Sequence, residues 1–530
     1  MPASTLESLV VLESSWTSFT INSLDPRHAR ILPILFQDKI SLPLRNKDGA
    51  HLLDETRSLL ITSLKRFVTI SGDYGVAPEN ITIVASPGVT QIDNFESLRS
   101  EVKSQLKLNI HALDRRTENK VYVHGLAAAF HHASGLFVDM KFSSTTFNWI
   151  DAKDEIRSGD REVSIPFGFG NLAPVMEADQ DVQEAKTQEI AEAVRQAMDS
   201  LDIPPSLTNV AERRGGHKLY ICGVGVRSLT YWLLCQHPRY PVSLASGFAQ
   251  TPERLCNDWA SVDWESFKRN SNMSETTRLR TKSSIFLAYS IYEALPSIRK
   301  ILYTENNMRD GILFNMLPSN ITAQDPIIVA TAPYALPGAL KLTSVLRNAL
   351  PSNTPEVISQ RLALALSNAS YIHSSYPREV QSNASMLVAT SGVLAAANGI
   401  SHTMRALLGL ALSNRWGGET TSRLRPVRKA FLAVPPEREL AWWALYLGHV
   451  MHLVGGAYPG AHVRPGVIDL SVKNETERGF TLSVVCHKDN VFGHNPIVQS
   501  RIDKLPVKIE ALAAEFAFTV PEVVIEVVSV

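Results

Sequence analysis

Apolar and polar positions in the first part of the chain change period several times, and each change predicts a new element. Leu9 to Ile21 alternates apolar and polar residues on either side of Glu13 to Ser15, which predicts a strand, a tight turn and a second strand. Helical spacing and one short apolar run then predict helices at 52–74, 95–106 and 121–132 and a buried strand at 80–85. This order is typical of an α/β domain.

Gly135 to Ile150 repeats the strand, turn and strand pattern. Asp139 ends the first apolar run, and a mostly polar turn separates it from Phe147. An Asp after a buried strand, followed by a turn of small residues, is how phosphate-binding folds aim a carboxylate and backbone N–H groups at one ligand. Here Lys141 and Phe142 stand where glycines are needed, and bulky side chains keep the backbone away from a phosphate.

Two such units, each followed by α/β segments, predict an actin-like (ribonuclease H-like) plan in which two hairpins face one another across a cleft. The alternative is two unrelated hairpins in an ordinary α/β protein. Further on, a strand at 218–222 runs into the turn Gly223 to Gly225, and Arg227 opens a helix. Glycine at such a turn leaves N–H groups and the helix dipole beside an anion, but a lone GxG is weak evidence.

We therefore expect three domains. Residues 1–150 and 151–330 are predicted to form two actin-like α/β domains, and 331–530 a mainly helical domain with a C-terminal α/β extension. A proline-bearing segment around Pro333 to Pro337 marks the last boundary. Helices of the third domain are predicted at 355–375, 379–398, 401–416 and 437–454, and Gly417 and Gly418 end the third of these.

Composition excludes several function classes. The 530 residues carry 52 basic and 52 acidic side chains, so no basic surface suited to nucleic acid or an anionic membrane is expected. The 4 cysteines show no CxxC pair and predict free thiols in a reducing compartment. We found no leader-like segment and no apolar run long enough to span a membrane. The expected location is the cytoplasm, with no nucleic-acid or membrane partner.

Histidines offer few metal sites. Adjacent side chains such as His131 and His132 point about 100° apart on a helix and do not share a metal. His449 and His452 share a helix face at i, i+3 and are candidate ligands, with satisfied or exposed histidines as the alternative. We expect no metal and no cofactor.

Seven segments carry a resemblance to a known family. They are FQDKISLPL, LKRFVTISGDYGV, GLAAAFHHASGLFVDM, VSIPFGFGNL, LYICGVGVRSLTYWLL, MRDGILFNML and RALLGLALSNRWGGE. Their order, from about residue 9 to 455, resembles the fungal retrograde regulation protein group within the exopolyphosphatase and guanosine pentaphosphatase family. The resemblance implies an actin-like pair of α/β domains followed by a helical domain similar to HD phosphohydrolases.

Most catalytic residues that the resemblance implies are absent. The family has a metal-binding Asp and a Gly-Ser-Asn loop where this chain has Val11 and then Glu13 to Ser15. The family's water-activating Glu falls on Pro87, which cannot act as a base, and only Glu118 remains of the acidic cluster that follows. Glu13 is an alternative source of the missing carboxylate, because it shares strand parity with Val11.

Part of the second loop is retained. Losing a positioned base costs on the order of 100- to 10,000-fold in rate, and losing the metal several kcal/mol more, so polyphosphate hydrolysis is not expected. Three family glycines have become Lys141 to Ser143, and Val224 replaces another. The matching residues are Asp139, Ser144, Thr145, Gly223, Gly225 and Arg227.

Aromatic residues take the place of the glycine loop. If the hairpins face one another, Trp16, Phe142, Phe147 and Trp149 converge on the cleft and would suit an apolar ligand. The alternative is that these rings fill the cleft as core. We expect a small, apolar substrate as the partner, and a homodimer is left open.

Three functions are compatible with this pattern. The preferred one is a fold repurposed for a metal-free cyclisation, cycloaddition or isomerisation in fungal small-molecule biosynthesis, which needs preorganisation rather than a metal. The others are a signalling pseudoenzyme that binds a nucleotide or a protein, and a residual exopolyphosphatase. Candidate catalytic residues are Asp139, Lys141 and Arg227, with His131 or His132 as further polar partners; candidate ligand-binding residues are Trp16, Phe142, Ser144, Thr145, Phe147, Gly223 and Gly225.

Overall fold

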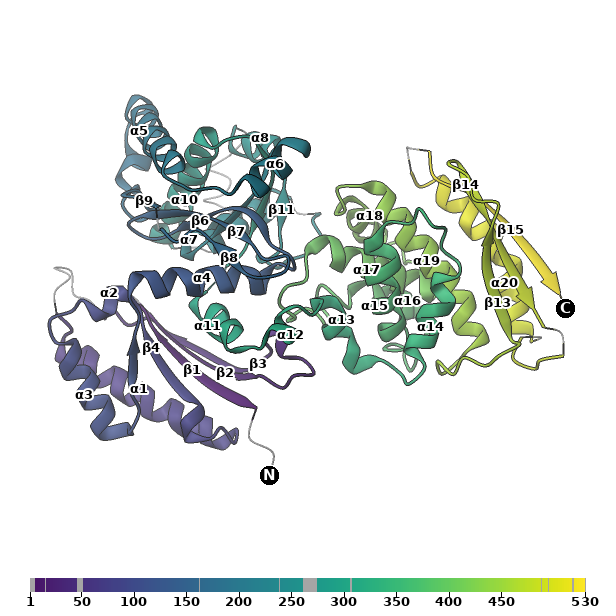
Figure 1. Ribbon diagram of the computed structural model, residues 1–530, viewed down its shortest axis with the longest axis horizontal. Helices are drawn as coiled ribbons and strands as arrows, with labels where there is room; N and C mark the ends of the chain where they lie inside the picture. The colour runs from purple at the N-terminus through teal and green to yellow at the C-terminus, as the bar shows by residue number, and fades with distance from the viewer. Residues whose placement is uncertain are drawn as a thin grey trace. The chain divides into compact units, whose positions relative to one another are not determined.

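The chain forms two compact units in the computed structural model (Figure 1). One contains Met1–Gln236 and Ala245–Gln324, and the other contains His237–Leu244 and Asp325–Val530. The structure describes residues 5–14, 16–44, 51–161, 163–237, 239–260, 274–305, 307–487, 489–493, 495–516 and 519–529, without the side chains of Val224, Ser228, Gln236, Trp259 and Ala260. Ser15 and the side chain of Val224, both used in the sequence argument, lie outside these described parts.

The first sheet has the strand order β3-β2-β1-β4-β5. Its strands are β1 (Leu6–Leu12), β2 (Thr17–Ser23), β3 (Ile34–Ile40), β4 (Ile81–Ala85) and β5 (Ile110–Ala112). The predicted hairpin is confirmed, since β1 pairs antiparallel with β2, and β4 lies parallel to β1 on its other side. Successive side chains of β1 enter different cores: Val10 and Leu12 pack on one face, Leu9 and Val11 on the other. Apolar residues on both faces mean that this sheet is covered on both sides.

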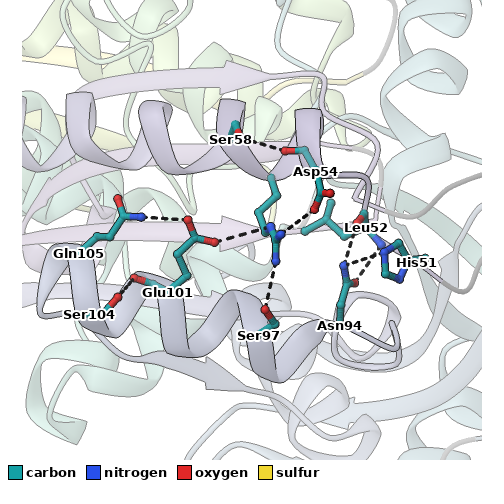
Figure 2. Close-up of polar contacts among 10 residues, drawn as sticks. His51, Leu52, Asp54, Ser58, Asn94, Ser97, Glu101, Ser104 and Gln105 are labelled. Carbon is teal, nitrogen blue, oxygen red and sulfur yellow. Dashed lines mark hydrogen bonds and ion pairs between the residues drawn. The ribbon is translucent and has the colours of Figure 1, made fainter.

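Helices α1 (Asp54–Asp73) and α3 (Phe95–Leu106) cover one face of this sheet (Figure 1). Both coincide closely with the predicted helices. Polar groups join them along their outer side (Figure 2), where Arg57 of α1 donates to Ser97 of α3 and pairs with Glu101. Asn94 lies just before α3. Its side-chain oxygen accepts a hydrogen bond from the backbone N–H of Leu52, and its Nδ2 donates one to the carbonyl of Leu52.

Helix α4 (Arg115–Ala129) covers the opposite face and packs against α11 (Met308–Met316). Gly311 of α11 allows this close approach, because a Cβ atom there would collide with the carbonyl of Val121 in α4. The predicted helix at 121–132 thus begins earlier and ends at Ala129. His131 and His132 follow the helix instead of lying on it, and Nδ1 of His132 contacts the carbonyl of Lys153 at 3.0 Å.

The second sheet has the order β11-β12-β10-β6-β7-β8, with β9 also paired to β7. Its strands are β6 (Ser134–Met140), β7 (Thr145–Asp151), β8 (Arg157–Ser158), β9 (Val163–Ile165), β10 (His217–Cys222), β11 (Ala249–Gln250) and β12 (Ile298–Tyr303). The hairpin predicted within 135–150 is confirmed as β6 and β7, paired antiparallel. Both strands belong to this second sheet, so the expected division after residue 150 falls within β7, one residue before its end. The change from one sheet to the next lies between Ala129 and Ser134.

Helices alternate along the chain with the strands of the second sheet, as α1 and α3 do with the strands of the first. They are α5 (Gln180–Asp199), α6 (Pro205–Arg213), α7 (Val224–Gln236), α8 (Pro252–Ala260) and α10 (Glu275–Ala294). Helix α10 packs against both α5 and α7. Two sheets built on one plan confirm the expected pair of actin-like domains.

The second compact unit is mainly helical up to residue 457. Its longer helices are α14 (Ala339–Arg347), α16 (Arg378–Leu387), α17 (His402–Arg415), α18 (Arg425–Ala433) and α19 (Arg438–Ala457). The predicted helix at 379–398 is wrong beyond Leu387, whereas the predicted stop at Gly417 and Gly418 is confirmed, with φ of +96° and +73°. The C-terminal extension consists of β13 (Ile468–Lys473), β14 (Gly479–Cys486), α20 (Pro496–Ala513) and β15 (Glu522–Ser529). Similarity to HD phosphohydrolases stays a prediction.

Two sequence expectations concern the chain as a whole. Within the described ranges, none of the helices combines the length and the apolar character that crossing a lipid bilayer requires. None of the 4 cysteines forms a disulfide within the described residues.

Candidate functional site

The two predicted hairpins line one cleft of about 1310 Å³ within the first compact unit. Glu13, Ser14 and Trp16 reach it from the β1–β2 loop, and the turn Lys141 to Ser144 reaches it from the second hairpin. Further lining residues come from β3, from the start of α2 (Pro87–Thr90), and from α4 and α10. The expectation that the hairpins face a shared cleft is confirmed.

Parallel pairing explains why polar groups gather at this edge of each sheet. Leu12 of β1 is opposite Ala85 of β4, and the N–H of Ser86 donates to the carbonyl of Leu12 at 3.0 Å. In the second sheet Asp139 of β6 is opposite Cys222 of β10. The next residue, Gly223, has φ of +103°, and a Cβ atom there would collide with Oδ1 of Asp139. Gly223 therefore makes room for this carboxylate.

A lysine ammonium lies between two carboxylates on the second-hairpin side of the cleft. Nζ of Lys141 is 3.4 Å from Oε2 of Glu118 and 3.6 Å from Oδ2 of Asp139. The Asp139 side chain is 4% exposed, the Glu118 side chain 14% and the Lys141 side chain 25%. Nζ also lies 5.4 Å from the centre of the buried Tyr122 ring. The ammonium thus neutralises much of the negative charge of Glu118 and Asp139, whose carboxylates are mostly shielded from water.

Glu13 completes this group as a third carboxyl. Burial, followed by the neighbouring Glu118 and Asp139, raises its pKa to about 8, against the lowering effect of Lys141 and Lys39. The side chain is therefore largely protonated at neutral pH. Glu13 lines the cleft, which supports the alternative that it supplies the carboxyl group missing at Val11. At neutral pH, however, this carboxyl group is largely uncharged.

A divalent cation of the kind that the resemblance implies does not fit these residues. Magnesium needs carboxylates free to coordinate it. Here the Lys141 ammonium lies between Glu118 and Asp139, Glu13 holds a proton, and the family's metal-binding Asp is the apolar Val11. Among the described residues, no group of three or more His, Cys, Asp or Glu side chains is placed to hold a metal ion.

Cations and hydroxyl groups also line the cleft, beside its apolar residues. Lys39, Arg115 and Arg280 line it together with Lys141. Their charges outnumber those of the lining carboxyls, since Glu13 is largely neutral and Glu118 is paired with Lys141. The lining hydroxyl groups belong to Ser14, Ser41, Ser86, Ser143, Ser144, Ser164, Thr277 and Ser284. This combination is suited to an anionic, oxygen-rich ligand.

Two aromatic rings at the cleft have cations over their faces. Nζ of Lys39 lies 3.8 Å from the ring centre of Trp16. Phe142 is 55% exposed, packs edge-to-face on Phe169, and has the Arg280 guanidinium 5.4 Å from its ring centre. Charged groups therefore lie over the faces of these rings, and the expectation of an apolar ligand stays a prediction.

The predicted site residues divide into two groups. Those at the cleft lining or in its charged cluster are Trp16, Asp139, Lys141, Phe142, Ser144 and Gly225. Gly225 is needed by packing, because a Cβ atom there would lie 2.8 Å from the Phe169 ring.

Other predicted residues are absent from the cleft lining. Thr145 is fully buried and donates to the carbonyl of Phe167 at 2.7 Å. Phe147 is 1% exposed and lies in the core, and Trp149 is partly buried in the same strand. Arg227 opens α7 as expected, but its side chain is 75% exposed and its nearest carboxylate is Glu305 at 3.7 Å.

Sequence reasoning missed the cations that line the cleft from distant segments. Lys39 is on an edge strand, Arg115 is the first residue of α4, and Arg280 lies in α10. Each looks like an ordinary surface charge in the sequence. The helix start at Arg115 was readable, because Asp114 is an N-cap whose carboxylate accepts from the N–H of Thr117.

The candidate ligand pair of the helical unit is buried. Burial lowers the pKa of both His449 and His452 to about 3, with nearby cations adding to the effect. His452 Nδ1 contacts the carbonyl of Arg415 at 2.9 Å. Both imidazoles are neutral at physiological pH.

Comparison with known proteins identifies two family matches that together cover most of the chain. Residues 20–320 match the Ppx/GppA phosphatase family, and residues 325–504 match the RTG2 C-terminal domain. A curated relative, retrograde regulation protein 2 of Saccharomyces cerevisiae, is 29% identical over 497 residues, which is 88% of this chain and 84% of that protein.

Two solved structures match the chain at low sequence identity. The type II variant of the Aquifex aeolicus Ppx/GppA phosphatase has 16% identity and a TM-score of 0.47, and it covers 59% of this chain and 100% of its own. An exopolyphosphatase from Cytophaga hutchinsonii has 14% identity and a TM-score of 0.45, covering 59% of this chain and 97% of its own.

Proposed function

Because the chain belongs to the Ppx/GppA phosphatase family, we propose that it is a regulatory pseudoenzyme whose cleft binds a phosphorylated ligand of the nucleotide class without hydrolysing it. The observation that carries this proposal is the Lys141 ammonium between Glu118 and Asp139. A metal-dependent phosphohydrolase needs those carboxylates for its cation. An internal ammonium supplies positive charge near a phosphate, but it does not activate a water molecule.

The missing base supports the same conclusion. Pro87 stands where the resemblance places the water-activating Glu, and it is a buried residue of the cleft lining at the start of α2. A positioned general base contributes on the order of 100- to 10,000-fold to the rate, and the metal contributes several kcal/mol. Lacking both, the cleft retains charge complementarity to phosphate but not the means to cleave it.

The lining supports an anionic rather than an apolar ligand. Lys39, Arg115 and Arg280 bring positive charge from three elements, and Ser86 and Ser144 add hydroxyl groups. The cyclisation or isomerisation hypothesis required an apolar pocket, and the cations over Trp16 and Phe142 argue against one. A regulatory role agrees with the name of the yeast relative, retrograde regulation protein 2, which this chain matches over most of its length.

Binding of ATP by the full chain tests this proposal. Isothermal titration calorimetry should give saturable binding that weakens at high salt, because exposed charges are screened. Arg280→Gln should weaken binding about ten-fold, whereas the control Arg213→Gln, an exposed arginine of α6, should not. A thermal shift with hydrophobic terpenoid compounds and none with nucleotides would reverse the choice between the two hypotheses.

A further inference from the structure

A second pocket lies within the helical unit and is independent of the cleft described above. Its volume is about 320 Å³, at the lower end of the range for small-molecule sites. Its walls come from the end of α17 and the following glycines, from α18, from α19 and from the end of α20. Gly417 and Gly418 contribute their backbone, so no side chain from this turn fills the space.

A buried amide oxygen in this pocket lacks a hydrogen-bond partner. The Asn414 side chain is fully buried, and its Nδ2 donates to the carbonyl of Leu445 at 3.1 Å. That bond fixes the amide orientation, because the reversed amide would bring two oxygens together. Oδ1 is left with no donor, and a Cβ atom on Gly418 of the lining would lie 2.5 Å from it. Leaving a buried acceptor without a hydrogen bond destabilises the folded protein, so a ligand group that donates to it is favoured.

Positive charge surrounds this acceptor. Arg425, Arg428 and Lys508 line the pocket, and Glu515 is the carboxylate that lines it with them. NH1 of Arg428 holds both oxygens of Glu515 at 2.8 and 2.9 Å, while the buried Nε of Arg428 has no hydrogen-bond partner. Lys508 donates to the carbonyl of Gly417 at 3.3 Å, which leaves its other two N–H donors for further acceptors.

We propose that this pocket binds a small phosphate monoester that also carries a hydroxyl group. The phosphate satisfies Lys508, Arg425 and the Nε donor of Arg428, and the hydroxyl donates to Oδ1 of Asn414. His449 also lines the pocket as a buried, neutral imidazole, which gives the ligand one more hydrogen-bonding group without adding charge. The helical unit thereby has a ligand site of its own.

Titration of the full chain with glycerol 3-phosphate tests this inference. Calorimetry should show binding, and the double substitution Lys508→Met with Arg425→Gln should weaken it at least ten-fold. The matched controls are Lys504→Met in α20 and Lys429→Gln in α18, which are exposed lysines on the same helices. These controls should bind like the unsubstituted protein.

A spectroscopic readout separates this pocket from the cleft. With ¹⁵N-labelled histidine, glycerol 3-phosphate should shift the resonances of His449, and it should still do so in Arg280→Gln, which alters only the cleft. Inorganic phosphate should compete more weakly, because it lacks the carbon-bound hydroxyl group. The inference is overturned if the His449 resonances do not move, or if the double substitution binds as tightly as the unsubstituted chain.

Discussion

The cleft of the α/β unit and the pocket of the helical unit treat buried ionisable groups in opposite ways. In the cleft a carboxyl, Glu13, is kept protonated by burial and by neighbouring carboxylates, and Lys141 neutralises much of the remaining negative charge. In the helical pocket a base, His449, is kept unprotonated by burial and by the cations Lys508 and Arg428. In the cleft, carboxylates are paired with the Lys141 ammonium. In the helical pocket, cations lie beside a buried acceptor that has no hydrogen-bond partner.

The largest expected effect is acid destabilisation of the helical unit. The folded-state pKa of His449 and His452 is about 3, below the ordinary 6.5. Their stabilising contribution is therefore fully present above pH 6.5 and is lost as pH falls toward 3, by about 3 kcal/mol per histidine at pH 4. Urea unfolding followed by the fluorescence of Trp442 and Trp443 in α19 measures this loss.

Substituting one histidine should sharpen this result. His449→Gln removes its share of the pH dependence, whereas His462→Gln, at an exposed position, should leave the slope unchanged. The cations facing the pair are Arg415, Arg428, Arg501 and Lys508. An unchanged slope in His449→Gln would show that its imidazole is not the group that resists protonation.

The next effect concerns the internal counter-ion of the cleft. Lys141→Met leaves Glu118 and Asp139 close together without their cation, and we expect a loss of about 2–3 kcal/mol in the free energy of unfolding at pH 8. Lys120→Met, an exposed lysine of the same helix as Glu118, is the control. Equal stability of both variants at pH 8 would contradict the role of Lys141.

A smaller effect of opposite pH dependence is expected for Glu13. Its folded-state pKa of about 8 lies above the ordinary 4.5, so its contribution to stability is fully present below pH 4.5 and is lost as pH rises toward 8. Glu13→Gln cannot ionise and should therefore be more stable than the unsubstituted protein by about 1–2 kcal/mol at pH 8, a value reduced for its partial exposure. At pH 4 the two proteins should be equal in chemical denaturation.

The smallest expected effect is that of restoring the missing base. Pro87→Glu places a carboxyl where the resemblance puts the water-activating residue, yet the cleft would still lack a site for a metal ion. Phosphate release from polyphosphate with magnesium should stay at the background rate. Measurable release would mean that a single residue separates this cleft from catalysis.

Much of the fold was predictable because the spacing of apolar residues along the sequence differs between strands and helices. Both hairpins, α1, α3 and the turn after β10 were found in this way. The sheet that the second hairpin joins could not be read from the sequence, because local patterning does not say which sheet a hairpin joins. That is decided by the pairing of β6 with β10, some 80 residues further along the chain.

The site was only partly predictable. Trp16, Lys141 and Phe142 were found because they interrupt a glycine loop. Lys39 and Arg280 were not, since their place at the cleft depends on tertiary packing. Phe147 was misplaced for a simpler reason: strand alternation alone does not say which face of β7 enters the core.

The most direct test of the central claim is ATP binding with and without magnesium, followed by a phosphate-release assay on the same samples. Because Lys141 already lies between the carboxylates, the affinity measured in EDTA should be within about three-fold of that in magnesium, and no phosphate should be released over hours. Binding that requires magnesium, or phosphate release above background, would contradict the account.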